Sequence, residues 1–208
     1  MKVLLLTAAL ISPAYQGVGP IGLWDSATTS QGGIGTTLEF RADGTFVEAT
    51  TVIVTFYYRV IGDRLVVAVQ PLGADPSVSQ SPSMTFEGDV LVMTDRDGSV
   101  VRKERMEVKG TGKPGLIGAW RYRHYTGATA FERYADDGRM FFRLPMRSAV
   151  GRYTVQSNEL VMVRPNEPDV KIAFEIRGDV LRLNNGAGNA DYRRDPAGPW
   201  YDAEHIAK

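Results

Sequence analysis

An internal repeat constrains this 208-residue chain more than any other feature of its sequence. Each copy contains a Gly-x-Trp motif, then an aromatic residue shortly before an Asp-Gly or Asp-Asp-Gly turn, then a Tyr-x-Val motif, and later a Gly-Asp-Val-Leu motif. The copies begin at Gly22-Leu23-Trp24 and at Gly118-Ala119-Trp120, and they end near Leu91 and Leu181. The paired landmarks keep a nearly constant spacing, which indicates duplication and predicts one architecture used twice.

Short apolar runs between glycine-containing turns predict that each copy is an up-and-down series of about seven or eight strands. The run 50–60 is β-branched and aromatic, which favours a strand. Asp43-Gly44 and Gly62-Asp63 supply residues that tolerate the positive φ of tight hairpins. No segment of ten or more residues shows helical periodicity. The predicted fold class is all-β.

The sequence divides into five segments. Residues 1–16 resemble a signal peptide, because Lys2 precedes an apolar run and Ser12-Pro13-Ala14 offers small residues for cleavage. A first buried strand is the alternative for this segment. The remaining segments are the first copy at 17–108, a Gly/Pro-rich linker at 109–115, the second copy at 116–195 and a tail at 196–208. The protein is therefore expected to be secreted or periplasmic, with peripheral or no membrane contact.

Composition excludes several functional classes. The chain has no cysteine, which rules out disulfides and thiolate chemistry. The formal net charge is zero, so the whole chain lacks the electrostatic footprint of a nucleic-acid-binding protein. We find no metal-ligand spacing, no nucleophile motif and no phosphate-binding loop. We therefore predict no catalytic residues, no metal and no cofactor, and we expect that the protein is not an enzyme.

The repeated pattern resembles the short lipocalin-like domains of secreted bacterial proteins. It runs from Gly-x-Trp to a closing Tyr192-Arg193-Arg194, and the first copy has Lys103-Glu104-Arg105 at that place, without the aromatic residue. The resemblance implies two tandem antiparallel up-and-down β-barrels, one per copy, each expected to fold alone. Ligand binding is implied only by analogy of fold.

One hairpin of the second copy carries the sharpest candidate group. Alternation places Trp120, Tyr122 and His124 on one face of a strand. A hairpin register set by Asp137-Gly138 would bring Tyr122 opposite Tyr134 and His124 opposite Glu132. A solvated rim pair without function is the simpler interpretation of His124 and Glu132.

The first copy has smaller residues, Ser26 and Thr28, where the second has Tyr122 and His124. We therefore predict the larger cavity in the first copy, with candidate walls Phe40, Phe56, Tyr58 and Met84. The alternative is that these side chains fill the space. The leading functional prediction is non-catalytic binding of a small apolar or amphipathic ligand. A structural or protein-interaction module of the cell envelope, with filled barrels, is the second.

Overall fold

The computed structural model describes residues 19–106, 115–195 and 198–204, which form fourteen antiparallel strands and no helix. The predicted signal peptide 1–16 lies outside the described residues, as do most of the linker and part of the tail. The first copy supplies β1 (Gly22–Ser26), β2 (Ile34–Phe40), β3 (Thr45–Ile61), β4 (Arg64–Ala68), β5 (Ser83–Glu87), β6 (Val90–Thr94) and β7 (Val100–Met106). The second supplies β8 (Gly118–Arg123), β9 (Thr129–Tyr134), β10 (Arg139–Gln156), β11 (Glu159–Val163), β12 (Val170–Arg177), β13 (Val180–Asn184) and β14 (Asn189–Arg194). The all-β prediction is confirmed.

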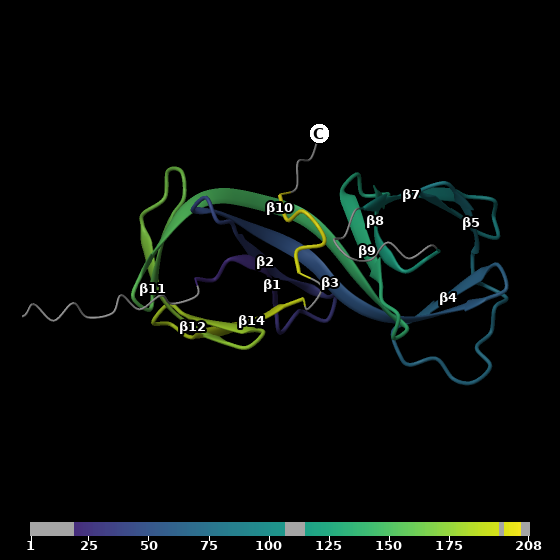
Figure 1. Cartoon of the computed structure of the whole chain (residues 1–208), viewed down its shortest axis with the longest axis horizontal. Coiled ribbons are helices and arrows are strands. Elements are labelled where there is room, and N and C mark those ends of the chain that lie inside the picture. Colours follow the sequence, from purple (N-terminus) through teal and green to yellow (C-terminus); the bar gives the residue numbers. More distant parts are fainter. Residues whose placement is uncertain (1–18, 107–114, 196–197, 205–208) are drawn as a thin grey trace, which may run out of the picture.

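Consecutive strands pair along the whole chain, and β1 also pairs with β14, so the sheet closes on itself. The long strands β3 and β10 pair with each other across this closed sheet, from Thr45↔Arg152 to Tyr57↔Arg139. Their pairing divides the structure into two lobes that share both strands (Figure 1). Lobe 1 contains β1, β2 and β11–β14 with one half of β3 and β10, and lobe 2 contains β4–β9 with the other half.

The two copies do not close separately, which corrects the expectation of one barrel per copy. Strands β1 and β2 of the first copy complete lobe 1 with β11–β14 of the second, and β8 and β9 complete lobe 2 with β4–β7. The physical reason lies in β3 and β10, whose strand-forming sequences continue without a turn through both lobes. A register shift between Pro145 and Arg147 interrupts their ladder, as expected where proline removes a backbone donor.

Equivalent elements of the two lobes are built alike. Trp24 and Trp120 are fully buried, and each indole N–H donates to a backbone carbonyl four residues earlier. A guanidinium lies over each indole, Arg194 over Trp24 at 4.1 Å and Arg105 over Trp120 at 4.2 Å. The structure therefore contains an internal control: a residue in one lobe can be compared with its counterpart in the other.

The aspartates beside turn glycines serve the turns, as the sequence predicted. The Asp43 carboxylate accepts from the Thr45 backbone N–H at 2.9 Å, and Asp137 accepts from Arg139 at 3.0 Å. Gly44 has a φ of 80°, a left-handed conformation that residues with a Cβ adopt only with strain.

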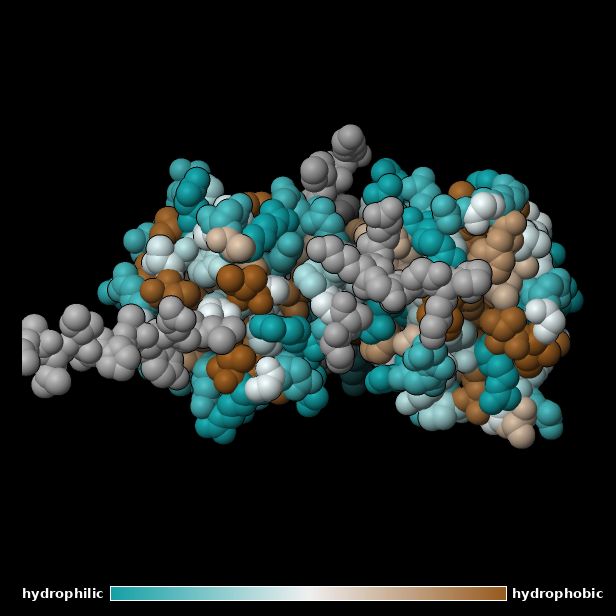
Figure 2. Space-filling view, in the orientation of Figure 1, coloured by the Kyte–Doolittle hydropathy of each residue, from teal (hydrophilic) through white to brown (hydrophobic). Residues whose placement is uncertain are grey.

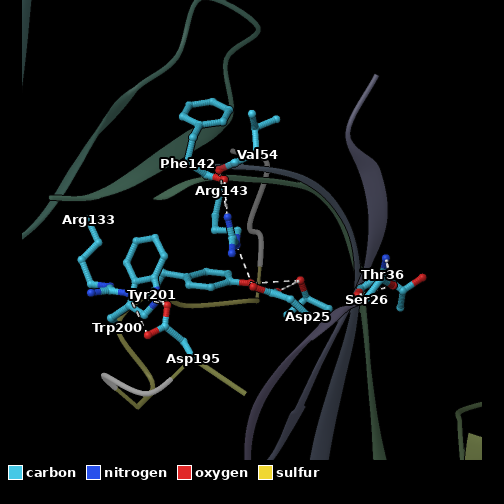
Figure 3. Close-up of polar contacts among 11 residues, drawn as sticks. Asp25, Ser26, Thr36, Val54, Arg133, Phe142, Arg143, Asp195, Trp200 and Tyr201 are labelled. Carbon is cyan, nitrogen blue, oxygen red and sulfur yellow. Dashed lines mark hydrogen bonds and ion pairs between the residues drawn. The ribbon is translucent and has the colours of Figure 1, made fainter. Parts of the chain in front are cut away.

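The tail docks on the outside of the sheet between the lobes. Trp200 and Tyr201 are buried there, and Figure 3 shows the Tyr201 ring reaching towards Asp25. The Tyr201 hydroxyl donates to Asp25 at 2.5 Å, and the Arg143 guanidinium donates to the same carboxylate at 2.7 Å. Asp25 lies on β1 in lobe 1 and Arg143 on β10, so this one carboxylate joins the tail and a shared strand to β1.

Candidate functional site

Lobe 2 encloses an open cavity of about 500 Å³, within the range of small-molecule sites. Its walls are mainly apolar and come from β3, β4, β6 and β10: Phe56, Leu65, Val66, Val67, Met93, Met140 and Phe142. The loop between β4 and β5 also lines it, through Ser77, Gln80, Ser81 and Pro82. Strands β4 and β5 are joined by the single pair Arg64↔Ser83, so the sheet is weakest beside this loop.

Four polar side chains meet inside the cavity. The Lys103 ammonium on β7 lies 2.5 Å from a Glu132 carboxylate oxygen on β9. The Tyr134 hydroxyl donates to the same oxygen at 2.6 Å. Lys103 also lies over the ring of Tyr122, 4.7 Å from its centroid. The side chains of Lys103 and Glu132 are only 8% and 6% exposed, so this ion pair is largely removed from water.

The environment of this cluster keeps both phenols protonated. Burial raises the pKa of Tyr134 well above its ordinary value, and the nearby Glu132 charge adds to the effect. The pKa of Tyr122 is raised for the same reasons, burial first and then Glu132. Two neutral hydroxyls and an ammonium are therefore held around one carboxylate, and the site is rich in hydrogen-bond donors.

The other lobe shows that the fold does not require this cluster. Trp24 pairs with Leu38 in lobe 1, whereas Trp120 pairs with Glu132 in lobe 2. In the same way, Leu181 pairs with Tyr192 in lobe 1, whereas Leu91 pairs with Lys103 in lobe 2. Burying an ion pair is commonly less stabilising than burying apolar side chains of similar volume. The Lys103–Glu132 pair therefore has no evident structural need, which is typical of a functional group.

The structure divides the ten predicted ligand-binding residues into two groups. Phe56, Tyr122, Glu132 and Tyr134 line the lobe 2 cavity, and Tyr58 and Met84 pack against the same hydrophobic core. The other four lie elsewhere: Phe40 in the core of lobe 1, Ser26 bonded to the backbone of Thr36, Thr28 exposed after β1, and His124 at a turn. The prediction of a cavity formed by the first copy is therefore wrong, because the walls of the lobe 2 cavity come from both copies.

The predicted pairing of His124 with Glu132 is also wrong. Glu132 pairs with Trp120, because a tight turn closed by His124 N–H and the Ala128 carbonyl shifts the register. The His124 Nδ1 instead lies 2.9 Å from the hydroxyl of Thr126. Partial burial lowers the pKa of His124.

Sequence reasoning missed the cation of the site. Lys103 stands at the position where the second copy has the closing Tyr192, and that difference was visible in the repeat. Glu132 at the position of Leu38 was visible too. The sequence did not show that these two differences between the copies lie side by side, because β8 separates β7 from β9 in the sheet.

Exposed hydrophobic residues gather near this cavity. Figure 2 shows a hydrophobic area at the lobe 2 end of the molecule, where β4 lies. Val60, Ile61, Val67 and Val69 are the large exposed aliphatic residues of this part of the chain. Val67 also lines the cavity, so apolar surface continues from the outside of lobe 2 to the site.

Comparison of the chain with protein-family models, curated proteins and solved structures gave no match. Across the described ranges, no three His, Asp or Glu side chains are grouped closely enough to hold a metal ion. The same residues contain no helix with the length and hydrophobicity needed to span a bilayer.

Proposed function

We propose that the protein is a secreted, lipocalin-like, non-catalytic binding protein for a small amphipathic molecule, which it holds in the lobe 2 cavity. The observation that carries the proposal is the buried Lys103–Glu132–Tyr134 cluster in a mainly apolar cavity. Ligand sites typically combine apolar walls with a few convergent polar groups that fix orientation. The apolar part of the ligand would lie against Phe56, Met93 and Phe142.

The charges of the cluster select the polar end of the ligand. Lys103 and Glu132 carry opposite charges, so the pair is neutral as a whole. An anionic or cationic ligand group would add an unbalanced charge to a largely buried site, which is unfavourable. A neutral oxygen that accepts hydrogen bonds, as in an alcohol, ketone or ester, would meet the donors of Lys103 and Tyr122 at no such cost.

The experiment is isothermal calorimetry of the full chain with 1-decanol, decanoate and decylamine, which share one hydrocarbon chain and differ in their head group. We expect saturable binding of 1-decanol, weakened strongly by Met93→Trp, which would fill the cavity. Leu183→Trp is the matched control, because Leu183 lines the corresponding cavity of lobe 1. Each variant is first checked by circular dichroism and thermal unfolding.

The polar contact is tested separately. Tyr122→Phe removes one hydroxyl donor and should weaken 1-decanol binding by about five- to tenfold, as expected for one lost hydrogen bond. Tyr125→Phe, at the 93% exposed neighbour, is the control. Absence of binding by all three probes, together with no retained small molecule in native mass spectra of protein from its own source, would instead support a structural module.

A further inference from the structure

Lobe 1 contains a second open cavity, of about 540 Å³. Apolar side chains from β2, β11, β12 and β13 form its floor and walls, among them Leu38, Met162, Ile172 and Leu183. The turn between β13 and β14 borders it through Asn185 and Gly188. None of the residues expected from the sequence to bind a ligand lines this cavity.

A carboxylate enters each cavity at the same level of the sheet, but from a different strand. In lobe 2, Glu132 on β9 is paired with Phe142 on β10. In lobe 1, the corresponding pair is Leu38 on β2 with Glu48 on β3. Glu48 and Leu38 both line the lobe 1 cavity, so the acidic and apolar positions are exchanged between the lobes.

The electrostatic environment of Glu48 differs from that of Glu132. The Arg164 guanidinium contacts Glu48 and also lies 3.3 Å from Glu167. Two carboxylates therefore share one cation, and the local charge is negative. Glu48 is more accessible than Glu132, with 36% of its side chain exposed.

The influence of Glu48 reaches the cavity wall. Tyr192 lines the cavity, and its pKa is raised first by burial and then by the negative charge of Glu48. The Arg164 guanidinium lies 5.6 Å from the centre of the Phe46 ring, so one of its faces is turned to an aromatic residue. The cavity thus combines an apolar floor with the Glu48–Arg164 pair at its accessible side, and Glu167, outside the lining, shares the cation of that pair.

We propose that the lobe 1 cavity is a second ligand site, which binds a small amphipathic amine with its ammonium group at Glu48 and its apolar part against Leu38, Ile172 and Leu183. A cation would balance the excess negative charge, whereas an anionic head group would increase it. The aromatic ring of Tyr192 offers an additional favourable surface for an ammonium group. This site does not depend on the proposed function of lobe 2, because the two cavities share no lining residue.

The test uses decylamine with the full chain at pH 7, where its ammonium is charged. We expect saturable binding that Glu48→Gln weakens about two- to fivefold, in keeping with one partly exposed charge contact. Glu175→Gln is the matched control, because Glu175 pairs with Arg177 and its own exposed side chain does not line the cavity. Decanoate should not bind at this site.

Leu183→Trp should abolish decylamine binding, and Met93→Trp in lobe 2 should leave it unchanged. If Leu183→Trp does not fold, Glu48→Gln still decides the question, since this side chain is partly exposed. Decylamine binding that is insensitive to Glu48→Gln, or that is lost with Met93→Trp, would overturn the proposal. Absence of 1-decanol binding to the unaltered chain, with decylamine binding intact, would refute the lobe 2 proposal alone.

Discussion

Converting the polar cluster of lobe 2 into its lobe 1 counterpart tests whether the cluster serves the fold. Glu132→Leu alone should destabilise the protein by about 3–5 kcal/mol, because it leaves the 8% exposed Lys103 ammonium without its partner. The Tyr134 hydroxyl would lose its acceptor as well, which adds about 1–3 kcal/mol. The effects overlap and are not simply additive.

The triple variant Lys103→Tyr, Glu132→Leu, Tyr134→Phe installs the residues that lobe 1 has at the same positions. It removes the ammonium, the carboxylate and the Tyr134 hydroxyl together, so its free energy of unfolding should lie within about 1 kcal/mol of the original or exceed it. Urea unfolding followed by circular dichroism measures both variants. Glu104→Leu is the control, because Glu104 lies on the same strand as Lys103, in an exposed pair with Arg121. This substitution should change the free energy of unfolding by less than about 0.5 kcal/mol.

The two results together show whether the cluster serves the fold of lobe 2 or the binding of a ligand. Recovery of stability in the triple variant, with loss of 1-decanol binding, would show that the cluster is kept for binding. A triple variant as unstable as Glu132→Leu would refute the reasoning, since the ion pair would then be needed by lobe 2 itself.

Three further predictions concern stability. Trp24→Ala and Trp120→Ala should each cost about 3–5 kcal/mol in urea unfolding, and a loss below about 1 kcal/mol would contradict their place in the cores. Tyr201→Phe should cost about 1–2 kcal/mol, because the buried Asp25 carboxylate loses one donor, and thermal unfolding would show it. Stability should also fall as the pH rises from about 10 towards 12 in an alkaline titration. The pKa of Tyr58 is raised to about 12, mainly by burial and to a smaller extent by the negative charges of two nearby aspartates. The unfolded state therefore loses its phenolic proton at a lower pH than the folded state. Below pH 10 both states keep that proton, and a flat profile above pH 10 would contradict this assignment.

Local features of the fold could be predicted from the sequence. The strands and the turn aspartates follow from short-range patterns, and the structure confirms them. The pairing of β3 with β10 could not be predicted in this way. Alternation along a strand shows which face each side chain occupies, but it does not indicate which neighbour the strand pairs with.

The candidate site was predicted in part for the same reason. Alternation predicts the inward position of Tyr122, which lines the cavity. Phe56 and Tyr134 also line it, although the first-copy cavity and the hairpin register that suggest them are wrong. From the sequence Lys103 is only a departure from the repeat, since its contact with Glu132 crosses an intervening strand. Departures from an internal repeat that leave a polar residue at a buried position are therefore the signal to follow in such chains.

The shared strands make a last prediction about the two copies. A fragment of residues 17–109 lacks the partners of β1, β3 and β7, which are β14, β10 and β8. It should not give a stable monomer, because these strand edges and the apolar residues of both half-lobes would be exposed to water. Mixed with residues 116–208, it should form a one-to-one complex with the circular dichroism spectrum of the intact chain, since all the ladders are then restored. Size-exclusion chromatography of each fragment alone and of the mixture measures this, with the intact chain as the control. A cooperatively unfolding monomer of either fragment would show that a copy can close by itself, and it would contradict the exchange of strands between the lobes.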